Sequence, residues 1–312
     1  MPSSHDYDAD QRNASIRIAI RQHATGAEFV HVARDEARVS VLDSGFMLGD
    51  GVWEGVRLHN GVLLHADKHI RRLFEGAKAL DMDLAITRDR LRDELYRICD
   101  AQGMRDNVHI RLMVTRGLKS TPYQSPKVTI GDPTIVIIPE YKASSEQTKE
   151  RGMRLYTVHV RRGPPDVQDQ MLNSHSKINC ITACIQAAKA GADEALMLDP
   201  HGFVATCNST NFFVVRDGEV WAPTTKYQLH GITRRHVLDL CRANDIPCVE
   251  KDFSLTEVYS ADEAFVTGTM AGQIPVTEVD GRTIGEAKRG PMVKRLQDLY
   301  KESIDAMARA GR

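Results

Sequence analysis

The chain has 312 residues, of which 42% are apolar and 27% charged, and this globular composition excludes a disordered or low-complexity protein. Its formal net charge of -1 gives no general attraction to nucleic acid or anionic lipid, so a small-molecule partner is favoured. No uninterrupted apolar run approaches the roughly 20 residues that a membrane helix requires, so a membrane-spanning protein is not expected. A chain of this length is expected to form two domains or one large one.

The N-terminal segment, residues 1–14, is polar and has no basic stretch followed by an apolar core. It is therefore expected to be a tail and not a signal peptide, which predicts a cytoplasmic location. The six cysteines are scattered, without a Cys-x-x-Cys pair or a His-rich partner segment. Neither a disulfide framework nor a metal site is therefore expected.

Residues 15–139 are predicted to form a small α/β domain. The strand signals are IRIAI, EFVHVA, the hairpin VRLHNGVLLH with its turn at Asn60-Gly61, NVHIRLMVTRG and PTIVIIP. The helix signals are HADKHIRRLFEGAKALDM and RDRLRDELYRICDAQG, the second ending at Gly103. The polar, uniform segment that follows, residues 140–152, is expected to be an interdomain linker.

Residues 153–312 are predicted to form a larger domain with a mostly β core. Strands are expected over RLYTVHVRR, EALMLD, GFVATCN, NFFVVRDGEVWAP with a turn at Asp217-Gly218, IPCVEKDF and EAFVTGTMAGQIPVTEVD. Helices are expected over NCITACIQAAKAGA, GITRRHVLDLCRANDI and the amphipathic C-terminus. The fold class expected from the whole chain is α+β with two unequal domains.

One lysine stands out because of its surroundings. Lys177 lies in the run LNSHSKINC, among small polar residues and directly before a helix with packed apolar positions. A lysine amine forms an imine with a carbonyl when desolvation or a nearby positive group keeps it neutral enough to attack. Without a carbonyl beside it, Lys177 would be an ordinary lysine near a helix start with its amine in water.

Three stretches have the chemistry of a phosphate site. In LHGITRRHV a glycine precedes Ile232 and Thr233 at a helix start, where backbone N–H groups and a hydroxyl can hold phosphate, although an ordinary helix cap has the same pattern. The turn in VTGTMAGQIP offers glycines and threonine hydroxyls. In HIRRL, Arg72 could make a bidentate phosphate contact, and the three stretches together could form one phosphate cup.

The order and wording of these motifs resemble the class IV, fold type IV, pyridoxal-phosphate aminotransferases, the group of branched-chain and D-amino-acid aminotransferases and aminodeoxychorismate lyase. The matching stretches are DSGFMLGDGVWEGVR, HIRRL, HSKIN, EALMLDPHGFVATCNSTNFFVV, GITRRHV and EAFVTGTMAGQIPV. They occur in the family's order, from about residue 40 to about residue 285. The resemblance implies a small α/β domain, a larger domain with a mostly β core, and the cofactor between them.

The resemblance also implies roles for individual residues. Lys177 would hold pyridoxal phosphate as an aldimine and move a proton between the substrate carbon and the cofactor carbon. The positions that correspond to the family's other cofactor contacts are Arg72, Thr206, Asn208, Ile232, Thr233, Thr269 and Met270. Of these, Arg72, Ile232, Thr233 and Thr269 would hold the phosphate.

At Thr206 the sequence departs from the family. The family has an acidic residue there, which pairs with the pyridine nitrogen of the cofactor and keeps it protonated. No carboxylate occurs between Phe203 and Phe213, so a small shift in the comparison does not restore one. A threonine can form a hydrogen bond but supplies no counter-charge, so a neutral pyridine and a weaker electron sink are expected.

Substrate recognition is expected to involve Trp53, Arg111 and Tyr123. Trp53 falls where many members have an active-site tyrosine, and Arg111 resembles the strand arginine of branched-chain enzymes. The arginine and histidine that D-amino-acid enzymes carry after TRG are replaced by Thr121 and Tyr123, which disfavours their carboxylate clamp. Arg116 remains an alternative to Arg111 for a substrate carboxylate.

The function implied by the resemblance is an aminotransferase that moves an amino group from an amino acid or amine to a 2-oxo acid in a ping-pong cycle. The alternative is a lyase of the aminodeoxychorismate type, or a racemase, because of Thr206. The family's active site is usually completed by a neighbouring subunit, so at least a homodimer is implied. The segments around DSGFMLGD and after TRG are the expected contributors.

Overall fold

The structure is a computed structural model that describes residues 10–143 and 146–312. The described chain divides into two compact units. The N-terminal unit contains residues 10–142, 172–177 and 305–312, and the C-terminal unit contains residues 143, 146–171 and 178–304. Most of the predicted N-terminal tail lies outside the described residues, and its last part begins a 3-10 helix, η1 (Gln11–Ser15).

The N-terminal unit is built on a six-stranded antiparallel sheet in the order β2-β1-β6-β5-β3-β4. The strands are β1 (Arg17–Arg21), β2 (Val30–Ala33), β3 (Gly51–His59), β4 (Val62–Leu63), β5 (Val108–Thr115) and β6 (Thr134–Tyr141). The β3–β4 hairpin turns at Asn60 and Gly61, both with positive φ, as the Asn-Gly signal predicts.

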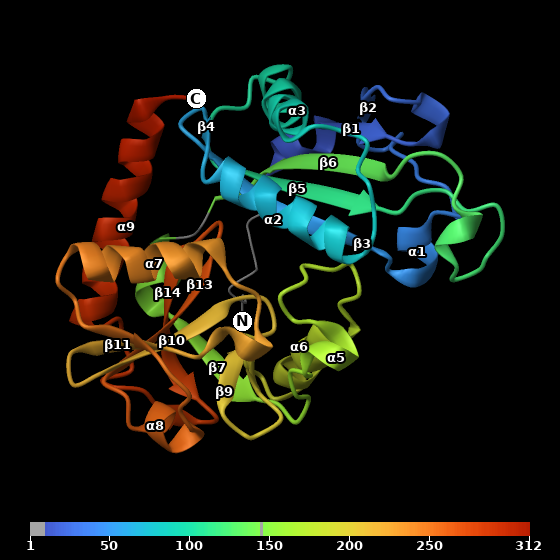
Figure 1. Ribbon diagram of the computed structural model, residues 1–312. Helices are drawn as coiled ribbons and strands as arrows, with labels where there is room; N and C mark the ends of the chain where they lie inside the picture. The colour runs from blue at the N-terminus through green and yellow to red at the C-terminus, as the bar shows by residue number, and fades with distance from the viewer. Residues whose placement is uncertain (1–9, 144–145) are drawn as a thin grey trace. The chain divides into compact units, whose positions relative to one another are not determined.

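Two helices pack against this sheet (Figure 1). Helix α2 (Ala66–Ala79) contacts β3, and helix α3 (Arg88–Asp100) contacts β6 and β1. Each follows the predicted helical spacing, and the apolar stripe of α2 contains Ile70, Leu73 and Ala77. The hydroxyl of Thr87 accepts from the Arg90 N–H and so caps α3. These contacts close one hydrophobic core, whose β5 members are Val108, Ile110, Leu112 and Val114.

The C-terminal unit is built on a nine-stranded mixed sheet in the order β12-β11-β10-β13-β14-β7-β8-β9, with β15 paired to β14. The strands are β7 (Met153–Thr157), β8 (Glu194–Leu198), β9 (Val204–Cys207), β10 (Asn211–Arg216), β11 (Glu219–Ala222), β12 (Cys248–Glu250), β13 (Glu263–Gly268), β14 (Gly272–Val279) and β15 (Arg282–Thr283). The helices are α4 (Glu146–Arg151), α5 (Pro165–Gln168), α6 (Ile178–Lys189), α7 (Ile232–Ala243), α8 (Leu255–Tyr259) and α9 (Pro291–Ala310), of which α9 enters the N-terminal unit at Asp305.

Strand β10 shows why the central strands of this sheet have continuous apolar sequences. Side chains alternate between the faces, so Phe212 and Val214 join one core cluster while Phe213 and Val215 join another that includes residues of α7 and α9. Phe213 stacks on Phe265 with ring centroids 4.7 Å apart. Because both faces are covered, the strand carries no polar alternation.

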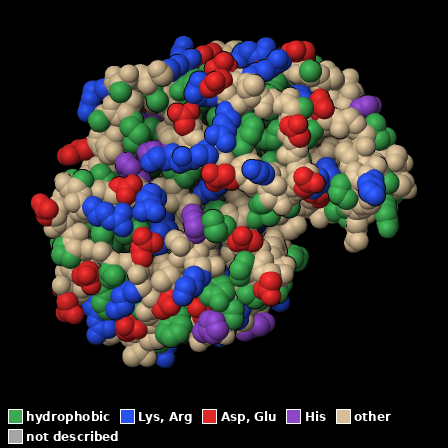
Figure 2. All heavy atoms as spheres, viewed as in Figure 1, with side chains coloured by type: hydrophobic (Ala, Val, Ile, Leu, Met, Phe, Trp, Pro, Cys, Tyr) green, Lys and Arg blue, Asp and Glu red, His purple; other side chains and the backbone are tan. Residues whose placement is uncertain are grey.

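The predicted strands and long helices are present, while the polar segment 140–152 contains regular structure. Strand β6 extends to Tyr141, and α4 occupies Glu146–Arg151. Acidic and basic side chains are interspersed on the face of the molecule in Figure 2, in line with the near-zero net charge. Among the described residues, no helix is both long enough and apolar enough to cross a membrane.

Candidate active site

The segment that carries Lys177 pairs with the edge of β3. The Trp53 N–H donates to the Asn173 carbonyl at 3.0 Å, and the His175 N–H donates to the Gly51 carbonyl at 2.9 Å. Ser174 forms a β-bridge with Val52 between these two bonds. Residues 173–175 therefore extend the six-stranded sheet, and Lys177 follows two residues later in a fixed register.

The residues around this pairing are small because the chains approach closely. A Cβ on Gly51 would overlap the Val114 carbonyl oxygen and would lie 2.5 Å from the His175 ring. The Ser176 hydroxyl donates to the Gly49 carbonyl at 3.1 Å. Burial lowers the pKa of His175, so its ring is neutral near pH 7. The run of small polar residues before Lys177 thus packs a strand edge.

The amine of Lys177 is held by a side chain from the same segment. Nζ donates to the Asn173 Oδ1 at 3.2 Å, and it lies 5.5 Å from the centroid of the Trp53 ring. Lys177 is half-buried. This is the arrangement expected of a positioned amine, not of a lysine extended into water.

Trp53 also contacts Arg111 from the neighbouring strand. Arg111 pairs with Gly55 in the β3–β5 register, and its guanidinium stacks on the indole at 3.8 Å from the centroid. Burial lowers the pKa of Arg111, and Glu140 partly offsets that effect. The arginine remains charged, because its ordinary pKa is far above neutrality. The structure therefore brings Lys177 and Arg111 together at the Trp53 ring, on one face of the six-stranded sheet.

Arg72 is held on the other face of β3. Successive strand side chains point to opposite faces, so Glu54 points toward α2 where Trp53 does not. Arg72 donates Nε to the Glu54 Oε1 at 2.7 Å and Nη2 to Oε2 at 2.8 Å, and His69 Nδ1 lies 2.7 Å from Oε2. Burial by itself would raise the pKa of Glu54, but Arg72 and His69 outweigh it and hold that pKa below its usual value.

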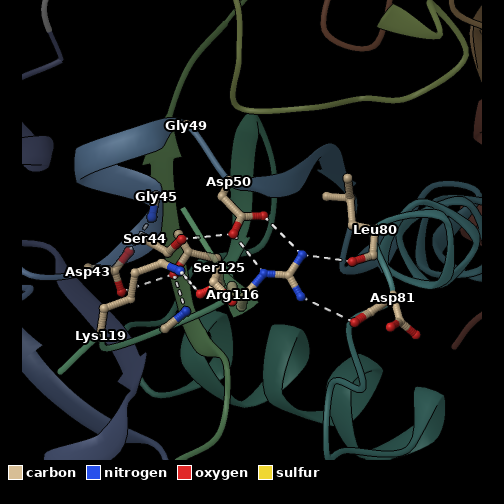
Figure 3. Close-up of polar contacts among 12 residues, drawn as sticks. Asp43, Ser44, Gly45, Gly49, Asp50, Leu80, Asp81, Arg116, Lys119 and Ser125 are labelled. Carbon is tan, nitrogen blue, oxygen red and sulfur yellow. Dashed lines mark hydrogen bonds and ion pairs between the residues drawn. The ribbon is translucent and has the colours of Figure 1, made fainter. Parts of the chain in front are cut away.

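Arg116, the alternative to Arg111, is committed to structural contacts (Figure 3). Its Nε and Nη2 donate to the Asp50 carboxylate at 2.7 and 3.2 Å, and its Nη2 and Nη1 donate to the Leu80 and Asp81 carbonyls at 2.7 and 3.2 Å. Asp50 also accepts from the Ser44 hydroxyl at 2.8 Å. Arg116 therefore ties the start of β3 to the end of α2, which leaves Arg111 as the candidate for a substrate carboxylate.

The loop after TRG places Tyr123 at the surface. Tyr123 is 61% exposed, whereas Lys119 is fully buried and donates Nζ to the Ser125 carbonyl at 3.1 Å (Figure 3). The Ser120 N–H donates to the Val128 carbonyl, which closes the loop as a short hairpin. A buried lysine thus holds the loop, and Tyr123 lies beyond this anchor.

In the C-terminal unit, Thr206 lies on β9 and is buried. Its hydroxyl donates to the Thr210 carbonyl at 2.9 Å, across the turn that joins β9 to β10. Asn208 in that turn is engaged by the backbone of Ala195, which donates its N–H to Oδ1 at 2.8 Å and accepts from the Asn208 N–H at 3.1 Å. Asn208 therefore shapes the turn through its own side chain.

The predicted phosphate residues of α7 begin a twelve-residue helix whose start is tightly packed. Gly231 is its N-cap, and a Cβ there would overlap the Asn211 Oδ1. Asn211 Nδ2 donates to Gln228 Oε1 at 2.7 Å and to the Leu229 carbonyl at 3.0 Å. Ile232 and Thr233 supply the first N–H groups of the helix, where an anion is stabilised.

The second predicted phosphate turn lies beside the same asparagine. Asn211 pairs with Thr267 across β10 and β13, and Gly268 pairs with Gly272 around the turn that holds Thr269 and Met270. The Thr267 hydroxyl is buried and has no hydrogen-bond partner within the described part of the chain. The structure thus gathers Ile232, Thr233, Thr269 and the β9–β10 turn around the first residue of β10.

Sequence reasoning missed three residues that organise these sites. They are Asn173, which holds the Lys177 amine, Glu54, which holds Arg72, and Asn211, which packs against the start of α7. Asn173 lies in NSHSK, Glu54 in WEG and Asn211 in STNFF, all within the stretches that carry predicted site residues. The carboxylate in the matching stretch DSGFMLGDGVWEGVR could have pointed to Glu54, because an arginine predicted to be buried requires an acidic partner.

The sequence of this chain matches the model of a known protein family. The model of the family described as amino-transferase class IV matches residues 51–279, which include every candidate site residue. The chain belongs to the class IV aminotransferases. This confirms the family predicted from the motifs.

Two relatives of the chain have names that refer to branched-chain aminotransferases. The chain is 39% identical to the branched-chain-amino-acid aminotransferase-like protein 2 of Arabidopsis thaliana over 274 residues, 88% of this chain and 49% of that protein. It is also 39% identical to a putative branched-chain-amino-acid aminotransferase of Methanocaldococcus jannaschii, over 87% of this chain and 93% of that one. The chain thus spans about half the length of the plant relative and nearly all of the archaeal one.

Solved structures confirm the predicted fold. The branched-chain aminotransferase of Thermoproteus uzoniensis with norvaline matches with a TM-score of 0.81 and 29% identity, covering 92% of this chain and 94% of that one. A second branched-chain amino acid aminotransferase, solved with pyridoxamine 5'-phosphate, matches with a TM-score of 0.84 and 28% identity, covering 93% and 94% of the two chains. The architecture of the chain is therefore fold type IV, of the predicted α+β class.

Proposed function

We propose that this class IV aminotransferase uses pyridoxal phosphate to move an amino group from an amino acid to a 2-oxo acid in two half-reactions. The observation that carries the proposal is the Lys177 amine, fixed on Asn173 and facing the Trp53 ring. The donor types present in the two units match the cofactor's chemistry, because an amine can bind an aldehyde, and a helix N-terminus with threonine hydroxyls can bind a phosphate.

Bound pyridoxal phosphate supplies an electron sink for the bonding electrons of the amino-acid α-carbon. The chain supplies the remaining functions. Lys177 holds the cofactor and then carries the proton at Nζ, which its hydrogen bond to Asn173 keeps in one place. We assign the phosphate to Arg72, Ile232, Thr233 and Thr269, and further cofactor contacts to Asn208 and Met270.

Thr206 would face the cofactor nitrogen without a charge. Its one hydroxyl proton is given to the Thr210 carbonyl, so in this arrangement its oxygen can only accept a hydrogen bond. An acceptor without charge stabilises a protonated ring nitrogen less than a carboxylate does. This feature is the reason to keep a second candidate function, a lyase of the aminodeoxychorismate type or a racemase, in view.

The proposed amino donor is a branched-chain amino acid, in keeping with the names of the plant and archaeal relatives described above. Arg111 is a charged group held flat on Trp53, and it would take a substrate carboxylate, with the indole as an apolar wall. Tyr123 would contribute to substrate binding from its exposed loop.

We propose a homodimer at least, located in the cytoplasm. Helix α6 directly after Lys177 exposes Ile178, Ile181 and Ile185 at 72%, 51% and 51%. These three residues follow helical spacing and form one apolar stripe, which a second copy would cover. Phe46, 74% exposed in α1 (Ser44–Leu48), adds an apolar group in a segment predicted to reach a neighbouring subunit.

The test of the proposal is Lys177→Ala in the purified protein. We expect the variant to lose the visible absorption of the lysine-bound cofactor and at least about a hundredfold in transamination rate, because the proton carrier is removed. Lys189→Ala, at the end of the α6 helix that follows Lys177, is the control. Equal spectra and rates for Lys177→Ala and the unmodified protein would refute the proposal.

A further inference from the structure

Asn173 is placed to accept the amine of Lys177, and its contacts fix which way its amide points. Nδ2 donates to the Trp53 carbonyl at 2.7 Å, and Oδ1 accepts from Lys177 Nζ at 3.2 Å. A carbonyl can only accept and an ammonium group can only donate, so both contacts require the same amide orientation. The side chain is only 7% exposed, and water competes little for either bond.

The backbone of Asn173 is fixed as firmly as its side chain. Its carbonyl accepts from the Trp53 N–H at 3.0 Å, so Trp53 is bonded to Asn173 through both its N–H and its carbonyl. Asn173 is therefore anchored to β3 before it reaches Lys177. Asn173 and Lys177 are four residues apart, which lets the lysine side chain turn back onto Asn173. No regular helix is needed for this contact, since α6 begins only at Ile178.

We infer that Asn173 is a positioning residue that docks the amine of Lys177 whenever that amine is not bonded to the cofactor. This inference rests on the proposed function, in which Lys177 alternates between holding the cofactor and carrying a proton. The amide oxygen favours the protonated amine and fixes its direction. Without Asn173 the amine loses this acceptor and the direction that it imposes.

The other charged and titratable groups nearby are constant in the variants chosen below. Arg111 stacks on the same Trp53 ring that faces Lys177, and His175 lies two residues before the lysine with its pKa lowered by burial.

The experiment measures how the reactivity of Lys177 toward an amine-acylating reagent depends on pH, in the full-length protein freed of cofactor, by peptide mass spectrometry. We expect Asn173→Leu to move the midpoint of that profile to lower pH by about one unit, the size of one hydrogen bond to a charged group. Asn173→Asp should move the midpoint to higher pH, because a carboxylate favours the ammonium form more strongly.

Ser174→Ala is the matched control. The Ser174 hydroxyl accepts from the Ser176 N–H at 3.0 Å, so its removal loosens the same segment without touching Nζ. The control should keep the midpoint of the unmodified protein. An unchanged midpoint in both Asn173 variants, or a shift in Ser174→Ala as large as in Asn173→Leu, would overturn the inference.

A separate measurement keeps this inference apart from the proposed function. Borohydride reduction of the cofactor-loaded protein, followed by peptide mapping, shows whether Lys177 carries the cofactor. If another residue carries it, the proposed function fails. If Lys177 carries it and the Asn173 variants leave the midpoint unchanged, only the role of Asn173 fails.

Discussion

At the residue scale, the arrangement around Glu54 shows how a buried carboxylate fixes the orientation of an arginine, Arg72, for which we propose a phosphate contact. Its carboxylate is fully buried and bonded to Arg72 through two N–H groups and to His69 through Nδ1. A guanidinium held at two points by a rigid strand has one orientation, which is what a phosphate contact requires. The phosphate contact proposed for Arg72 would therefore depend on Glu54, a residue that would not touch the cofactor.

We predict that Glu54→Gln lowers the free energy of unfolding by about 3 kcal/mol near pH 7, because Arg72 keeps a largely buried charge without its partner. The measurement is urea unfolding followed by circular dichroism. The exposed Glu75 of α2 offers a control, since Glu75→Gln removes only a surface ion pair with Arg71. Equal stabilities for the two variants would contradict the proposed role of Glu54.

The pKa of Glu54 also predicts a pH dependence. Because Arg72 and His69 hold that pKa below its usual value in the folded state, the stabilisation is present above the usual value and is lost as the pH falls through the lowered one. We therefore expect the unmodified protein to lose more stability than Glu54→Gln on acidification below the usual carboxylate pKa. Parallel stability curves for the two proteins would exclude this contribution.

The stacked arginine yields a kinetic prediction. Arg111→Ala should raise the KM of the amino acid by at least roughly tenfold, the loss of one charge-assisted contact, with a smaller change in kcat. Steady-state kinetics with one donor and a saturating acceptor measures this. An unaltered KM would remove Arg111 from substrate binding and leave it as a partner of Trp53 alone.

At the element scale, the start of α7 combines a helix N-terminus with very close packing. Gly231 has φ of -59°, a conformation open to any residue, so the reason for glycine is space and not backbone geometry. The Asn211 Oδ1 occupies the position where a side chain would begin. The helix N–H groups of Ile232 and Thr233 are thereby set against β10.

We predict that Gly231→Ala lowers the free energy of unfolding by about 1–3 kcal/mol, because its Cβ would overlap Asn211 and force a shift of the helix start. Its affinity for pyridoxal phosphate should fall as well, which cofactor titration by fluorescence measures. The double variant Gly231→Ala with Asn211→Ala relieves the overlap and should recover part of the stability. Loss of stability in the double variant equal to the sum of the single losses would contradict this account.

The elements themselves followed from the sequence more fully than the contacts did. The apolar spacing of residues 65–82 predicted α2, and the Asn60-Gly61 and Asp217-Gly218 signals predicted two hairpins, because these patterns act over neighbouring residues. The docking of Asn173 against Trp53 joins residues 120 positions apart, and no local pattern encodes it. The contacts of Arg116 with the end of α2 are of the same kind.

The chemistry of the site divides in the same way. Lys177 could be found because the residues around it are unusually small and polar for a lysine near a helix start. The family motifs gave Arg72, Thr233 and Thr269 as expectations. The sequence favoured Arg111, which resembles the strand arginine of branched-chain enzymes, and left Arg116 as an alternative. The hydrogen bonds of Arg116 to Asp50, Leu80 and Asp81 weigh against that alternative, and they depend on the packed structure.

At the scale of the whole molecule, the chain crosses between its two units several times. The segment 172–177, with Lys177, belongs to the N-terminal unit although the residues on both sides of it belong to the C-terminal one. The lysine is therefore mounted on the sheet of one unit and joined directly to α6 of the other. The exposed apolar stripe of α6 begins at the next residue, so an assembly contact there would act close to Lys177.

We predict that Ile181→Lys, in the middle of that stripe, shifts the protein toward monomers, because a charge replaces an apolar group that a second copy would cover. Light scattering coupled to size exclusion measures the molar mass. Val30→Lys, on the edge strand β2, is the control, since Val30 is an exposed apolar residue of the other unit. A molar mass unaffected by Ile181→Lys would place any subunit contact elsewhere.

Transfer of amino groups through a cofactor bound to Lys177 is the activity that we propose for this chain. The most direct measurement is the absorption spectrum of the purified, cofactor-loaded protein, titrated first with single L- and D-amino acids and then with a 2-oxo acid. We predict that an L-branched-chain amino acid removes the visible band and that a 2-oxo acid restores it, with one amino group moved per site. A visible band that no amino acid converts, or pyruvate released without any acceptor, would contradict the claim.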